Sequence, residues 1–298
     1  MSGEKLKIWF GFFIISTVWG STWLAIKIGI TAIPPFLAAG VRFVIASFVL
    51  YVIIRVRGLK IVTTPDAKKL YVAMGVLSFT IPFALVYWGE QYIPTGLSSI
   101  LFAAYPFWVA LFSHFFLRSE PIDGFKAAGI VMGFLGILLI FWGDFDVDNP
   151  RAALGMGAMV CSTILQAYTL IVVKKLGQPI SPFVMNFCGM VMASVALVLL
   201  SALTEGWGEI RWTLPAAGSV VYLAIVGSVV TFVTYYWLLK RIQAVYLSLT
   251  SFINPIVAVI LGAVVLDETL GGSVAAGAAM VLAGILLANG KFFLGKLS

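Results

Sequence analysis

Ten apolar stretches of about 20 residues follow one another along the chain, and they constrain its fold more than any other feature. At a rise of about 1.5 Å per residue, a helix of that length crosses the roughly 30 Å hydrocarbon core of a bilayer. The predicted spans are residues 8 to 30, 36 to 55, 70 to 89, 97 to 117, 124 to 142, 152 to 173, 182 to 203, 214 to 239, 244 to 266 and 273 to 290. The connections are short, which leaves no segment for a separate soluble domain. We therefore predict an all-α, polytopic membrane protein with ten transmembrane helices.

The composition and the distribution of charge support this fold and suggest an orientation. Only 10% of the residues are charged, whereas a soluble domain has about 25%. With both termini in the cytoplasm, the inner segments contain fifteen of the 19 basic residues, namely Lys5, Lys7, Arg55, Arg57, Lys60, Lys68, Lys69, Arg118, Lys126, Lys174, Lys175, Lys240, Arg241, Lys291 and Lys296. This is the positive-inside bias of membrane proteins. The basic residues form no soluble basic face, so we predict no nucleic-acid partner despite the net charge of +7.

The chain repeats itself once, at offsets of 147 to 149 residues. The matches include Lys27 with Lys174, Pro35 with Pro182, Phe83 with Phe232, Tyr87 with Tyr236, Pro106 with Pro255, Glu120 with Glu268, and Gly129 with Gly277. Each half, residues 1 to 147 and 148 to 298, contains five predicted spans. An odd number of spans makes the second half enter the membrane from the opposite side. The sequence thus predicts two inverted five-helix repeats, an arrangement common in secondary transporters.

The sequence resembles the drug/metabolite transporter superfamily, and specifically its ten-span members with two EamA-type halves. The resemblance rests on Trp19-Gly20-Ser21 followed by Lys27, on Arg42-Phe43 leading to Ala46, on Pro106 and Pro255 in mid-span, and on Glu120 and Glu268. It implies export of amino acids, aromatic ones among them, or of related small metabolites across a bacterial inner membrane. One departure is that the first span lacks the carboxylate of the small multidrug-resistance members, which disfavours proton-coupled export of cationic drugs.

Two prolines are candidate hinges. Pro106 and Pro255 lie near the centres of the fourth and ninth spans, where proline removes the hydrogen bond to the carbonyls of Phe102 and Ser251. Weak points at matching depths in both halves favour movement during alternating access. The alternative is a pair of static kinks that shape the packing.

Several side chains at membrane depth are candidates for substrate binding. Trp19 lies too deep for the interfacial belt, Trp23 follows it one turn along, and Gln166 occupies the position in the second half that matches Trp19. They are predicted to line a cavity, with a packed core as the alternative. Polar groups beside the prolines and in the third span either bind substrate or satisfy helix backbones, and these are Tyr105, Ser251, Asn254, Ser78 and Thr80.

Arg42 places a full charge about two turns inside its span, where burial is costly. It is predicted to attract a substrate carboxylate near the outer mouth, or else to extend to the surface and stabilise the fold. The same alternatives apply to Lys27. The aromatic clusters Tyr87-Trp88 and Tyr235-Tyr236-Trp237 lie close to span ends, and we expect them in the interfacial belts.

Other functional classes fit the sequence less well. One histidine, His114, and two cysteines within spans supply no catalytic constellation or metal site, so we predict neither an enzyme nor a metal or other cofactor. A passive channel and a membrane scaffold or receptor are the alternatives. A channel is disfavoured because no ring of like charges is present. The expected partners are a small-molecule substrate and the lipid bilayer.

Overall fold

The structure is a computed structural model that describes residues 3–117, 124–142, 150–208, 210–269 and 271–288, and the regular structure in these ranges is entirely helical. The first half contains α1 (Gly3–Ile30), α2 (Pro35–Val56), α3 (Pro65–Ala73), η1 (Met74–Thr80), α4 (Ile81–Gly89), α5 (Thr95–Phe102), α6 (Tyr105–Leu117) and α7 (Gly124–Trp142). The second half contains α8 (Pro150–Leu176), α9 (Pro182–Thr204), α10 (Leu214–Ala224), η2 (Ile225–Val230), α11 (Thr231–Leu239), α12 (Ala244–Ser248), η3 (Leu249–Phe252), α13 (Ile253–Leu266) and α14 (Gly272–Ala288).

The helices have the length and the surface of membrane spans. Seven helical runs among the described residues are long and apolar enough to cross a bilayer, and shorter apolar helices within α7, α13 and α14 account for the other three predicted spans. Large apolar side chains are exposed around the bundle, such as Phe13 at 63% and Phe48 at 67%. Lipid, rather than water, stabilises such a surface. The predicted all-α membrane fold is therefore confirmed.

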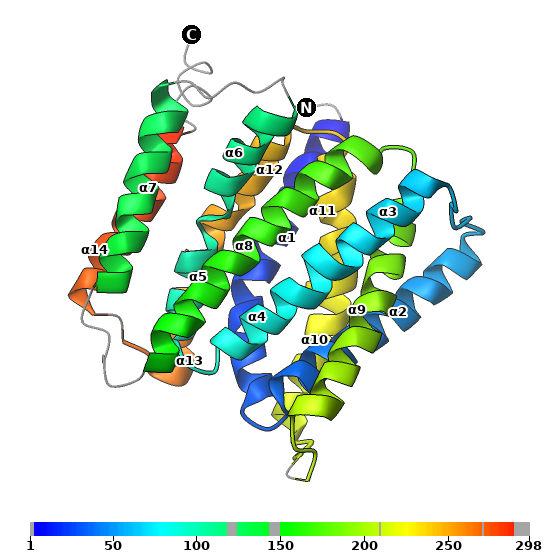
Figure 1. Ribbon diagram of the computed structural model, residues 1–298, viewed down its shortest axis with the longest axis horizontal. Helices are drawn as coiled ribbons and strands as arrows, with labels where there is room; N and C mark the ends of the chain where they lie inside the picture. Colours follow the sequence, from blue (N-terminus) through cyan, green and yellow to red (C-terminus); the bar gives the residue numbers. More distant parts are fainter. Residues whose placement is uncertain (1–2, 118–123, 143–149, 209, 270, 289–298) are drawn as a thin grey trace.

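The two halves have opposite orientations. The helix α1 begins, and α14 ends, at the same face of the bundle, whereas α8 begins at the opposite face after five spans (Figure 1). We call the first the N-terminal face and the second the far face. Equivalent helices pack across the boundary between the halves, α2 against α9 and α7 against α14. The last pair is so close that a Cβ atom on Gly284 would lie 2.6 Å from the carbonyl oxygen of Gly129.

Four spans depart from regular α-helix, and they do so in equivalent pairs. Between α3 and α4, and between α10 and α11, the chain widens into the π-helical segments η1 and η2. The fourth span breaks between α5 and α6, directly before Pro106, and the ninth passes through the 3₁₀ segment η3, directly before Pro255. The breaks were predicted from the prolines, but the π-helical segments were not. Glu120, one of the residues that defined the repeat, lies outside the described residues.

Candidate substrate pocket

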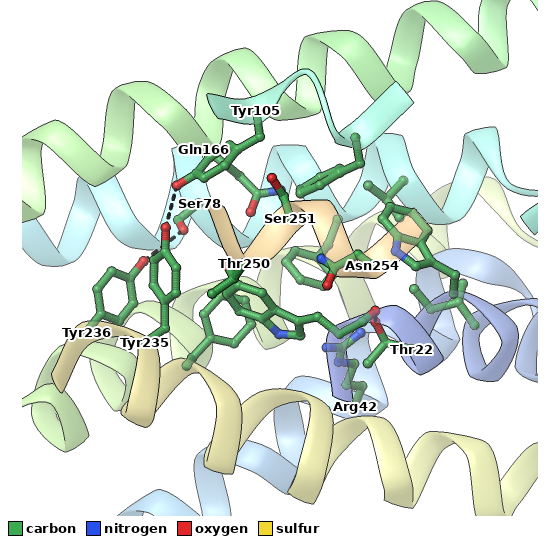
Figure 2. A pocket seen from close by; sticks show the side chains of 17 residues that line it. Thr22, Arg42, Ser78, Tyr105, Gln166, Tyr235, Tyr236, Thr250, Ser251 and Asn254 are labelled. Carbon is green, nitrogen blue, oxygen red and sulfur yellow. Dashed lines mark hydrogen bonds between the residues drawn. The ribbon is translucent and has the colours of Figure 1, made fainter. Parts of the chain in front are cut away.

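A cavity lies at the centre of the bundle, where the irregular segments of both halves meet. About 770 Å³ of space free of protein atoms lies in it, part of it open to the surroundings. The lining residues are Trp19, Thr22, Trp23, Ile26, Arg42, Ser78, Phe83, Val86, Phe102, Tyr105, Gln166, Phe232, Tyr235, Tyr236, Thr250, Ser251 and Asn254 (Figure 2).

The structure therefore brings together most of the residues singled out in the sequence. Of the nine predicted binding residues, only Thr80 does not line the cavity. Its hydroxyl instead donates a 2.7 Å hydrogen bond to the carbonyl of Gly75, five residues earlier in the π-helical segment η1. Thr80 thus lies outside the pocket wall, with its hydroxyl engaged by its own helix.

Aromatic rings form the walls of the pocket and join the two halves. The indole of Trp19 lies 5.3 Å from the ring of Phe232 and 5.0 Å from that of Tyr235, both on α11. On the other side, Trp23 meets Phe102 edge to face at 5.3 Å. Such tilted and edge-to-face contacts hold the rings in fixed orientations. The walls of the pocket are thus largely aromatic and are shared by both halves.

Arg42 is the one charged residue among the described lining residues, and it is only 2% exposed. The nitrogen Nε donates to the Ser228 hydroxyl at 2.8 Å, and Nη2 to the carbonyl of Gly227 at 3.1 Å. The ring of Phe83 lies 4.9 Å from its guanidinium carbon. Two ion pairs join described residues, and both lie elsewhere, at α3 and between Glu4 and Arg241. A buried guanidinium without a carboxylate partner is a strong site for an anionic ligand group.

Three buried tyrosines correct the sequence interpretation. Tyr87, Tyr235 and Tyr236 were expected in the interfacial belts, but each is at most 3% exposed. The hydroxyl of Tyr235 lies 2.9 Å from that of Tyr105, and the hydroxyl of Tyr236 lies 3.4 Å from that of Ser78 (Figure 2). These residues lie on the inward faces of α4 and α11, so proximity to a span end was a misleading signal.

A different sequence signal could have identified these positions and several others that were missed. Phe83 and Tyr87 are one helical turn apart, and they match Phe232 and Tyr236 in the second half. Aromatic residues at the same spacing in both repeats indicate a shared inward face. Of these four, all but Tyr87 line the pocket, and Tyr87 lies 3.4 Å from Nη1 of Arg42.

The polar groups around the two helix breaks mainly satisfy the backbone. The hydroxyl of Ser251 donates to the carbonyl of Ser248 at 2.7 Å, and that of Thr250 to the carbonyl of Leu247 at 2.9 Å. In the amide orientation that satisfies its neighbours, Asn254 donates to the carbonyls of Ser16 and Thr250. These bonds support the interpretation that the side chains repair the break, and their place in the pocket wall leaves their remaining acceptor capacity toward the cavity.

Lys27 has a structural role that the second half repeats. Its Nζ donates to the carbonyls of Glu90 and Ile93, at the end of α4, at 2.6 and 3.1 Å. The equivalent Lys174 donates to the carbonyls of Leu239 and Ile242, at the end of α11, at 2.7 and 2.8 Å. A lysine at a helix C-terminus satisfies carbonyls that have no partner within the helix. Lys27 thus fixes the fold rather than lining the pocket.

The fold and the pocket define a class of protein, a polytopic membrane protein with two inverted halves around a central pocket. The chain belongs to the EamA-like transporter family, which it matches over residues 6–142 and 153–290. It is therefore a membrane transporter whose substrate is a small molecule, of a family of transporters rather than enzymes. The resemblance to the drug/metabolite transporter superfamily is confirmed.

Individual relatives are similar over nearly their whole length. The uncharacterized transporter YoaV of Bacillus subtilis is 27% identical over 282 residues, which cover 95% of this chain and 96% of that protein. The uncharacterized inner membrane transporter YedA of Escherichia coli K12 is 28% identical, over 90% of this chain and 85% of its own. One solved crystal structure shares the fold, with a TM-score of 0.70 at 21% identity, over 94% of this chain and 96% of the other.

Proposed function

We propose that the protein exports amino acids with aromatic or other bulky apolar side chains, or closely related metabolites, across a bacterial inner membrane by alternating access. The observation that carries the proposal is the buried Arg42 at the edge of an aromatic pocket, where no described acidic side chain neutralises it. A carboxylate can take two parallel hydrogen bonds from a guanidinium. The aromatic walls then accept the side chain.

The orientation follows from charge. The loops at the N-terminal face carry most of the basic residues, so this face is cytoplasmic by the positive-inside rule, and so are both termini. The far face is then periplasmic. For a carrier that follows a gradient, metabolically produced amino acids leave the cell without an additional energy source.

The conformation supports alternating access. The pocket extends from the centre of the bundle to Ile26 and Val86, each within one turn of a helix end at the far face. α11 runs from the pocket toward the N-terminal face and carries Tyr235 and Tyr236. Their hydroxyl groups bond to those of Tyr105 and Ser78 in the first half and so link the two halves. This arrangement fits a state closed to the cytoplasm. Exchange of the contacts between the two repeats, with bending at Pro106 and Pro255, would produce the opposite state.

Flux into liposomes tests the function. Purified protein in vesicles loaded with unlabelled phenylalanine should accumulate labelled phenylalanine transiently, and the initial rate should saturate. A linear, non-saturating flux would indicate a channel. No flux for any amino acid, with folded protein in the vesicles, would contradict the proposal and favour a scaffold or receptor.

Removing a pocket wall should abolish this exchange without affecting insertion. We expect Trp19→Ala or Gln166→Ala to lower the exchange rate at least tenfold, because the first removes the ring that contacts Phe232 and the second removes an amide that faces the cavity. The matched control is Trp212→Ala, which truncates an exposed indole outside the helices. Normal exchange in both pocket variants would remove these residues from the site.

A further inference from the structure

A fully buried carboxyl group at the far face takes no part in the proposed transport mechanism. Glu90 follows α4 directly and is 0% exposed, and neither of its carboxylate oxygens has a hydrogen-bond partner among the described residues. Burying an ionised carboxylate without partners is strongly unfavourable, because nothing replaces the water that it loses. The side chain therefore requires an explanation that packing does not give.

The charged groups around Glu90 are already engaged. Lys27 of α1 directs its ammonium to main-chain carbonyls, including that of Glu90 itself, and forms no ion pair with the Glu90 carboxylate. Glu268, after α13, accepts from the N–H groups of Thr95 and Gly96 at 2.8 and 3.2 Å and so caps α5. The charges of Lys27 and Glu268 thus offset each other at this junction. An ionised Glu90 would add an uncompensated negative charge.

On the side of α8, the guanidinium of Arg151 lies over the ring of Tyr92, 5.7 Å from its centroid, and forms no hydrogen bond with the Glu90 carboxylate. Gly89 and Gly155 meet backbone to backbone there, since a Cβ on Gly89 would lie 2.9 Å from the Gly155 carbonyl oxygen and 3.2 Å from the side chain of Met159. Such close contact also excludes water. Burial, opposed in part by Lys27 and reinforced by Glu268, raises the pKa of the Glu90 carboxyl well above its ordinary value.

We propose that Glu90 is a proton-binding site, which holds a proton in the conformation described and releases it in a conformation in which the contacts of α4 with α1, α5 and α8 loosen and admit water to the carboxyl group. Proton binding and opening of the junction are then linked, so that pH biases the conformational equilibrium. The proposed proton site goes beyond amino-acid transport, because Glu90 does not line the pocket. The two are neighbours, since the lining residue Ile26 precedes Lys27 and the lining residue Val86 lies one turn before Glu90.

The internal repeat provides the comparison. At the N-terminal face, Lys174 makes the same pair of bonds as Lys27, but the position that matches Glu90 is Leu239. The pair of lysine bonds thus forms without an acid at the position of Glu90. The carboxyl group is an addition on one face only, which makes the two faces respond differently to pH.

Thermal unfolding of the purified protein between pH 5 and pH 8 tests the proton site without reference to transport. An unfolded glutamate loses its proton near pH 4.3. Above this pH the folded protein retains a proton that the unfolded chain lacks, so stability falls as pH rises, until the pKa of the folded state is reached. Glu90→Gln mimics the protonated form and removes this fall. From pH 5 upward, the wild-type midpoint should decline relative to that of Glu90→Gln by about 3 °C per pH unit.

Two further measurements make the result decisive. Asp66→Asn, which removes an exposed carboxylate on α3, should keep the wild-type dependence on pH. Infrared spectra of the wild type at pH 7 should contain the C=O stretch of a protonated carboxyl group in an apolar environment, and the spectra of Glu90→Gln should lack it. Parallel unfolding curves for wild type and Glu90→Gln, or identical infrared spectra, would overturn the proposal, whatever the outcome of the transport assays.

Discussion

Replacing Arg42 with methionine is expected to lower kcat/KM for amino-acid exchange on the order of 30- to 5,000-fold. The estimate corresponds to the roughly 2 to 5 kcal/mol lost when one partner of a buried, hydrogen-bonded charge pair is removed. Here the second partner would be the substrate carboxylate. Methionine has a similar length and no charge, so the fold should tolerate the change.

Substrate analogues show whether the guanidinium binds the carboxylate. The wild type should strongly prefer phenylalanine to its decarboxylated amine as a competitor, whereas Arg42→Met should discriminate weakly between them. Arg42→Lys should be intermediate, because lysine keeps the charge but not the planar pair of donors. Arg211→Met, at an exposed position in the loop before α10, is the control. If Arg42→Met keeps the preference for phenylalanine, the cation supports the fold instead of binding substrate.

The double substitution Pro106→Ala and Pro255→Ala is expected to slow exchange at least tenfold while leaving substrate affinity within about twofold. Alanine supplies an N–H group that can bond to the carbonyls of Phe102 and Ser251 and so join α5 to α6 and η3 to α13, which proline prevents. Continuous helices in the fourth and ninth spans should therefore favour one conformation over the other. Binding, measured by ligand-induced thermal stabilisation, should be retained because the prolines do not line the pocket.

The control for this pair is Pro215→Ala. Pro215 lies in the first turn of α10, where the missing N–H group has no partner within the helix. Its replacement should leave exchange at the wild-type rate. Unchanged exchange in the double variant as well would identify the two breaks as static features of the packing.

The ten spans and their inverted arrangement were predictable because they depend on properties that the sequence displays directly. A bilayer of fixed thickness demands apolar runs of fixed length, and the match of Pro106 with Pro255, or of Lys27 with Lys174, makes the repeat evident. The pocket was predictable to the extent that unusual residues lay at membrane depth. Trp19, Arg42 and Gln166 were identified in this way, and all three line it.

The remaining features depend on packing, which local patterns do not specify. Tyr235 and Tyr236 look like interfacial residues until the inward face of α11 is known. The π-helical segments have no distinct sequence signal, yet η2 supplies Ser228 and the Gly227 carbonyl that hold Arg42. Glu90 looks like an ordinary residue at a span end, and only the contact of α4 with α8 shows that it is sealed from water.

Labelling of a single cysteine in the pocket tests alternating access most directly. Ser251→Cys would be made in a protein whose native cysteines, Cys161 and Cys188, are replaced by alanine, and probed with an impermeant maleimide in right-side-out and inside-out vesicles. Lys60→Cys and Trp212→Cys serve as controls in loops proposed to be cytoplasmic and periplasmic, respectively. The account predicts that position 251 is labelled from both sides and protected by phenylalanine on either, whereas each loop is labelled from one side only. Labelling of position 251 from one side alone, during active exchange, would contradict it.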